Sequence, residues 1–128
     1  MSKKKLVKKL DAVFSKYIRW LYADDNGYVS CYTCGTTKHV SEMQNGHFQS
    51  RRHYATRWNE DNCRPQCKKC NIFSQGNIWI YGNKLKAEIG EEKLDKIIQL
   101  SRTTIKTTEH EYKILIKVYT EKLKKLTM

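Results

Sequence analysis

The stretch that decides the fold is CKKCN at residues 67–71, together with CYTC at residues 31–34. Two thiolates at the spacing Cys-x-x-Cys on a tight turn can both reach one metal ion, and two such turns complete a tetrahedron around zinc. Gly35, directly after the first pair, suits the sharp backbone turn of a zinc knuckle. A structural Zn²⁺ ion is therefore predicted on Cys31, Cys34, Cys67 and Cys70.

The cysteine count is odd, because Cys63 stands outside both pairs. An odd count with two Cys-x-x-Cys pairs favours a metal site in a reducing compartment over a disulfide framework. The N-terminus is charged and lacks the apolar segment of a secretory signal, which favours a cytoplasmic protein. Cys63 is predicted to be a free thiol packed in the core.

Length and charge bound the remaining possibilities. The chain has 128 residues, 39% of them hydrophobic, and a formal net charge of +12. No apolar run is long enough to span a membrane, which excludes a transmembrane protein. The length suits a single domain over 1–128, divided into an N-terminal helix (1–25), a zinc-bound core (26–89) and C-terminal helices (90–128). The charge favours a polyanionic partner, most simply nucleic acid.

Hydrophobic periodicity predicts helices on both sides of the core. An apolar stripe at steps of three and four residues indicates a helix over residues 3–23, and similar stripes indicate helices over 78–89 and 91–100, separated by Gly90. Thr107 and Thr108 followed by Glu111 resemble a capping box that starts a last helix over 109–126. The predicted fold class is α+β, a small zinc-bound core flanked by helices.

Residues 28–70 have little helical periodicity and several β-prone pieces. Tyr28–Ser30 is predicted to be a strand that leads into the first cysteine pair. His47-Phe48 and residues 55–58 are predicted to form the two strands of a hairpin.

The segment between the cysteine pairs carries the candidate catalytic residues. His47 follows a glycine in a β-prone stretch and can act as a general base if a neighbouring carbonyl or amide orients its ring; Asn62 is a candidate for that role. Asn71 follows Cys70 directly, and its side-chain oxygen could reach a hard divalent cation. Taken singly, each also fits an ordinary surface histidine or turn asparagine.

Together these residues resemble a known family. His47, Asn62 and Asn71 between two zinc knuckles are similar to the HNH (ββα-metal, treble-clef-like) nucleases, including the endonuclease VII type, and more closely to the phage NinG/Rap recombination endonucleases. The resemblance extends from about Phe14 to about Tyr81. The motifs that carry it are Tyr32-x-Cys34-Gly35, Gly46-His47-Phe48-x-Ser50-Arg51-Arg52-His53, Ala55-Thr56-Arg57-Trp58, Asn62, Gln66-Cys67, Cys70-Asn71 and Gly76-Asn77-Ile78.

The resemblance implies a metal-dependent DNA endonuclease that hydrolyses phosphodiester bonds in branched recombination intermediates such as Holliday junctions or flaps. It gives His47 the position of the general base, Asn62 that of the brace of the active-site hairpin, and Asn71 that of the last ligand of a catalytic Mg²⁺ or Mn²⁺. HNH nucleases commonly carry an Asp or His as a second metal ligand directly before the catalytic histidine, where this chain has Gly46. Residues that could complete the metal site are His53, Gln75, Asn77 and Asp61, and His47 could itself be a ligand.

DNA contacts are expected from the basic residues of the core. Arg51, Arg52 and Arg57 could hold phosphates, either at the scissile bond or along the backbone. The same role is expected for Lys68 and Lys69 and for the lysines of the terminal helices. Of Trp58, Trp79 and Tyr81, at least two are expected in the core, although each could stack on exposed bases.

The resemblance also implies a setting and leaves two alternatives. A phage-encoded protein would act in the cytoplasm of its bacterial host, and cutting both strands of a four-way junction implies a homodimer, with the apolar faces of the terminal helices as the expected interface. One alternative is a nonspecific or site-specific HNH nicking nuclease. The other is a non-catalytic zinc module that only binds nucleic acid, in which His47 would be dispensable.

Overall fold

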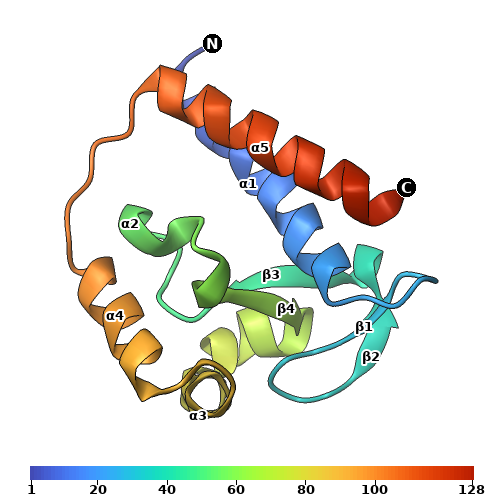
Figure 1. The fold of residues 1–128 in the computed structure, drawn as a ribbon. Coiled ribbons are helices and arrows are strands. Elements are labelled where there is room, and N and C mark those ends of the chain that lie inside the picture. The colour runs from blue at the N-terminus through green and yellow to red at the C-terminus, as the bar shows by residue number, and fades with distance from the viewer.

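Helix α1 (Lys3–Leu21) and helix α5 (Glu109–Thr127) lie side by side and run in the same direction in the computed structural model, which describes residues 1–128 (Figure 1). Each begins at a side-chain cap: Ser2 accepts from the backbone of α1, and Thr108 forms the predicted capping box with Glu111. The two ends of the chain therefore form one layer of the molecule.

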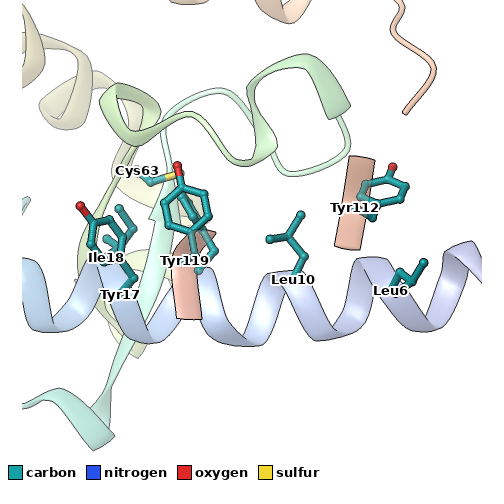
Figure 2. Close-up of a cluster of buried hydrophobic side chains, with 8 residues drawn as sticks. Leu6, Leu10, Tyr17, Ile18, Cys63, Tyr112 and Tyr119 are labelled. Atoms are coloured by element: carbon teal, nitrogen blue, oxygen red, sulfur yellow. The ribbon is translucent and has the colours of Figure 1, made fainter. Parts of the chain in front are cut away.

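The apolar faces of these two helices form the largest hydrophobic cluster. Figure 2 shows Leu6, Leu10 and Ile18 of α1 on the side that faces Tyr112 and Tyr119 of α5. The faces expected to form a dimer interface thus pack against each other within one chain. A dimer could use them only by separating the two helices.

Two small antiparallel sheets lie beneath this layer. Strand β1 (Tyr28–Ser30), as predicted, pairs with β2 (Thr37–His39), and β3 (Met43–His47) pairs with β4 (Cys63–Cys67). The protein is therefore of the mixed α+β class, as the sequence indicated.

The predicted hairpin between His47-Phe48 and residues 55–58 is wrong. Residues 54–57 form a one-turn helix, α2 (Tyr54–Arg57), and β3 pairs instead with β4, whose register places His47 opposite Cys63. Strand β4 has the sequence CRPQC and is fully buried. Its charged residue and its proline are atypical of a buried strand, so the sequence did not indicate one. The pairing of β3 with β4 depends on long-range contacts that local β-propensity does not report.

The remaining helices agree with the periodicity to within one or two residues. Helix α3 (Ile78–Ile89) ends at Gly90, whose φ of 90° favours glycine, and α4 (Glu91–Ser101) follows at once. They pack on the core through Phe48, Tyr81, Leu85 and Ile97. An extended segment, residues 102–108, then returns to the start of α5 (Figure 1).

The aromatic residues divide as expected. Tyr81 is fully buried, and Trp58 packs against the α1–α5 cluster, whereas Trp79 is 81% exposed. None of the helices combines the length and apolar character needed to cross a membrane.

Candidate metal centre and active-site cavity

The four paired cysteines converge on one point. Their sulfur atoms all lie within 4.8 Å of one another, and the Sγ atoms of Cys34 and Cys67 are 3.7 Å apart. Four sulfurs about 2.3 Å from a tetrahedral zinc ion are separated by about 3.8 Å. The cluster is therefore positioned to bind a metal ion and is consistent with structural zinc.

Burial and hydrogen bonds with the other cysteines raise the pKa of Cys34 and of Cys70, but the surroundings of Cys31 favour the thiolate form that zinc requires. Burial of Cys31 opposes ionisation, but hydrogen bonds from the Thr33 side chain and from backbone N–H groups lower its pKa to about 6. Cys63 behaves differently. It is fully buried in the α1–α5 cluster, where burial raises the pKa of its thiol, so it is the packed free thiol that the sequence predicted.

The second cysteine pair also orients Asn71. Cys70 and Asn71 lie in a π-helical turn, Lys69–Phe73, that follows β4. The side-chain nitrogen Nδ2 of Asn71 donates to Gln44 Oε1 at 2.7 Å. The side-chain oxygen Oδ1 of Asn71 has no hydrogen-bond partner in the protein. A cavity of 640 Å³ opens here, and His47 and Asn71 both line it.

A backbone carbonyl orients His47. Its Nε2 lies 2.9 Å from the carbonyl oxygen of Arg57. Because a carbonyl only accepts hydrogen bonds, Nε2 carries the proton and Nδ1 keeps its lone pair. The ring is thus held in the tautomer that can accept a proton at Nδ1.

Burial lowers the pKa of His47 below its ordinary value, and the charge of Arg51 lowers it further. The hydrogen bond to Arg57 and the charge of Asp11 act in the opposite direction but do not cancel the effect of burial. The imidazole is therefore neutral at physiological pH.

Asn62 is not hydrogen-bonded to His47, so the orienting role expected of it belongs to the Arg57 carbonyl. Asn62 is fully buried and joins the two ends of the loop between β3 and β4. Its Oδ1 accepts from the backbone N–H of Gln49 at 2.7 Å, and its Nδ2 donates to the carbonyls of Gln49 and Thr56, each at 3.0 Å. This position matches a brace of the loop that follows His47.

The missing ligand at Gly46 has a steric explanation. A Cβ at this position would lie 2.0 Å from Oε1 of the fully buried Gln66. Any further oxygen ligand must come from another element. The cavity includes Gln75 among the predicted candidates, and His53, Asn77 and Asp61 do not line it.

Sequence reasoning missed two residues of the cavity, Asn45 and Asp11. The Oδ1 atom of Asn45 is buried without a hydrogen-bond partner. Asp11, the single acidic residue of α1, reaches the cavity from outside the cysteine-bounded segment. A lone acid in a lysine-rich helix was the available signal.

The predicted DNA-contacting residues differ in accessibility. Arg51, Arg52, Lys68 and Lys69 are exposed, and Arg51 lines the cavity. Arg57 is only 8% exposed, and its guanidinium is bound by Asp11 and by the carbonyl of Arg51. This placement argues against the expected phosphate contact by Arg57.

Comparison with known proteins gives two findings. The family model described as "Bacteriophage Lambda NinG protein" matches residues 1–128. "Protein ninG" of Escherichia phage lambda is 32% identical over 97 residues, which cover 75% of this chain and 47% of that relative, so the chain spans about half the length of the curated relative it matches. No solved structure matches the chain.

Proposed function

The chain belongs to the NinG family, and from this membership together with the His47 cavity we propose that it is a DNA endonuclease with an HNH (ββα-metal) type of core. Its proposed substrates are branched recombination intermediates, and its proposed cofactors are structural zinc and a catalytic Mg²⁺ or Mn²⁺. The observation that carries the proposal is a neutral histidine, held by a carbonyl at Nε2, in the same cavity as Asn71.

In the proposed reaction, Nδ1 of His47 takes a proton from a water molecule whose oxygen attacks the phosphorus. The bond from phosphorus to the 3′ oxygen breaks, and the 3′ oxygen leaves. A neutral base is required for this step, and burial of His47 favours its neutral form. The loop brace formed by Asn62 keeps the backbone after His47 in place.

The oxygen donors of the cavity fit a hard cation only with help from the substrate. The Oδ1 of Asn71 has no protein partner, and the Oδ1 of Asn45 is buried and unpaired. Both donors are neutral, and the carboxylate of Asp11 is already hydrogen-bonded to arginines. A bound divalent cation would stabilise the charge that develops on the phosphate, which would itself supply the anionic ligand.

The charge distribution supports DNA as the partner. Arg51 lines the cavity, Arg52 lies beside it in sequence, and Lys68 and Lys69 are exposed on the turn that carries Asn71. We expect these residues to bind phosphates next to the scissile bond. Symmetric cutting of a four-way junction needs two active sites, so we expect two copies on one junction, measurable by sedimentation.

The decisive experiment compares wild type with His47→Ala on four labelled substrates: a four-way junction, a flap, a plain duplex and a single strand. Each is incubated with Mg²⁺, with Mn²⁺ or with EDTA. We expect metal-dependent cutting of the branched substrates that His47→Ala abolishes. His110→Ala is the control, because His110 is exposed on α5 and does not line the cavity.

The other outcomes separate the alternatives. If plain duplex and junction are cut equally, the proposed specificity for branched DNA is wrong and the protein is a nonspecific nicking nuclease. DNA binding without cutting in either metal, unaffected by His47→Ala, would leave a zinc module that only binds nucleic acid.

A further inference from the structure

We propose that Asp11 of α1 is a positioning residue for His47, acting through Arg57 on the carbonyl that holds the imidazole ring. The inference rests on the proposed function for its catalytic consequence, but the arrangement itself is a property of the folded chain. Asp11 lies 36 positions before His47 in the sequence and makes no hydrogen bond to it.

Three side chains of the segment between β3 and β4 converge on the Asp11 carboxylate. Oδ1 accepts from Arg57 Nε and from Trp58 Nε1, both at 3.0 Å. Oδ2 accepts from Arg51 Nη2 at 3.0 Å and from Arg57 Nη2 at 2.5 Å. Each oxygen therefore receives two hydrogen bonds, and the pairing with Arg57 is bidentate, which fixes orientation as well as distance.

Asp11 binds the last residue of helix α2, which is too short to satisfy its own backbone hydrogen bonds. Helix α2 has four residues, so its last carbonyls find no partner within the helix. The carbonyl of Arg57 instead accepts from Nε2 of His47 at 2.9 Å, with the Cys63 thiol 3.8 Å away. The side chain of Arg57 is bound by Asp11 and its backbone carbonyl binds His47, so one residue links the two.

Burial makes this link stiff. Arg57 is 8% exposed, and its remaining guanidinium nitrogen, Nη1, donates to the carbonyl of Arg51 at 3.0 Å. The rings of Tyr54 and Trp58 lie 5.0 and 5.4 Å from the guanidinium carbon. A buried guanidinium in which each of the three nitrogens donates a hydrogen bond has little freedom to move, and neither does the backbone that carries it.

The ion pair has a second consequence for substrate binding. Arg51 is the exposed partner of Asp11, with 65% of its side chain accessible, whereas Arg57 is enclosed. Arg51 can therefore leave Asp11 for a phosphate while Arg57 keeps its two bonds. Release of Arg51 would leave the hold on His47 intact.

The test uses the zinc-loaded chain of residues 1–128 and two readouts. The first is the tautomer of His47, read from the ¹⁵N shifts of its ring nitrogens by NMR. The second is the single-turnover cleavage rate on a four-way junction, measured beside the Kd for the same junction. The variants are Asp11→Asn, which removes the charge and one acceptor oxygen, and Asp11→Glu, which keeps the carboxylate.

The matched control is Glu88→Gln. Glu88 is the carboxylate partner of another buried arginine, Arg64, which is 2% exposed, at 2.8 Å. This control therefore also unpairs a buried guanidinium, but neither Arg64 nor Glu88 is hydrogen-bonded to His47 or to Arg57. A loss of stability shared by both variants is thereby separated from a loss of positioning.

We expect the Nε2–H tautomer alone in wild type and in Glu88→Gln, and a mixture of tautomers in Asp11→Asn. The cleavage rate of Asp11→Asn should fall by about 10- to 100-fold, the effect of misplacing a catalytic group by about 1 Å, with the Kd for the junction changed less than about threefold. Asp11→Glu should recover part of both signals.

An unchanged tautomer in folded Asp11→Asn overturns the proposal, and so does the same mixture in Glu88→Gln. If Asp11→Asn does not fold, the double variant Asp11→Asn/Arg57→Gln, which leaves no unpaired buried charge, provides the same tautomer readout. Absence of cleavage by wild type would count against the proposed endonuclease alone, because the tautomer experiment needs no activity.

Discussion

The side chain of Gln66 fills the space that a side chain at position 46 would need: its Oε1 lies 2.0 Å from the ideal Cβ position of Gly46. The two residues lie on paired strands, and Gln66 is fixed there by hydrogen bonds from Nε2 to Thr33 and to the carbonyl of Gly76. The absence of an acidic ligand directly before His47 is therefore built into the packing of the sheet.

An acidic residue introduced at position 46 should destabilise this protein. We expect Gly46→Asp and Gly46→Ala each to lower the free energy of unfolding by about 1–3 kcal/mol, because both force the buried Gln66 amide to move. Denaturant unfolding measures the change. The double variant Gly46→Ala/Gln66→Ala should lose less than the sum of the two single variants, and strict additivity would contradict the steric explanation.

Zinc removal should unfold the core. Structural zinc contributes about 10–16 kcal/mol in small domains, which is comparable to the whole stability of a domain. We expect Cys34→Ser to reduce the bound zinc below one ion per chain and to lower the melting temperature, and a chelator to do the same in wild type. Cys63→Ala is the control, because Cys63 lies outside the cluster. This variant should still bind one zinc ion per chain.

Lowering the pH should reduce the cleavage rate only at pH values below the ordinary pKa of a histidine. The pKa of His47 is lowered chiefly by burial and further by Arg51, so the neutral base persists below the usual value of about 6.5. Lowering the pH through this depressed pKa protonates the base, and the rate falls. Arg51→Ala should move the acid limb of the pH–rate profile to higher pH, and a shift to lower pH would contradict this account.

The two arginines bound to Asp11 should give different phenotypes. Arg51 is exposed, so Arg51→Ala should weaken DNA binding and reduce the slope of log Kd against log salt by up to about 0.9. Arg57 is buried, so Arg57→Ala should mainly lower the melting temperature by leaving Asp11 without its closest partner. If Arg57→Ala lost as much DNA affinity as Arg51→Ala and kept its stability, the phosphate contact that the sequence predicted for Arg57 would be supported instead.

Trp79 should contribute to binding DNA that has unpaired bases. It is 81% exposed on α3, and the neighbouring Ile78 lines the cavity that contains His47. Stacking of an aromatic ring on a base contributes about 1–3 kcal/mol, so Trp79→Ala should weaken binding of a branched or single-stranded probe by about fivefold or more. Plain duplex should bind equally well, and Ile105→Ala, an exposed apolar residue of the 102–108 segment, serves as control.

The four long helices, unlike the one-turn helix α2, could be predicted because the signals that mark them are local. The apolar stripe of α1, the Thr108–Glu111 capping box and Gly90 each act within a few residues, and the structure confirms all three. The Cys-x-x-Cys spacing is equally local and predicted the metal cluster. The β3–β4 pairing was missed because it joins segments far apart in sequence and because Arg64 is buried by a partner on α3.

By itself, the sequence determined which residues form the four long helices, which four cysteines are spaced to bind a metal ion and which histidine stands in the segment between them. Periodicity, capping and ligand spacing are properties of short stretches, so they can be read before folding. Only the tertiary structure decided that the Arg57 carbonyl rather than Asn62 orients His47, that Gln66 excludes a ligand at position 46, and that Asp11 reaches the cavity from α1. These relationships depend on how separate elements pack, and that packing is set by long-range burial of side chains that no local pattern records.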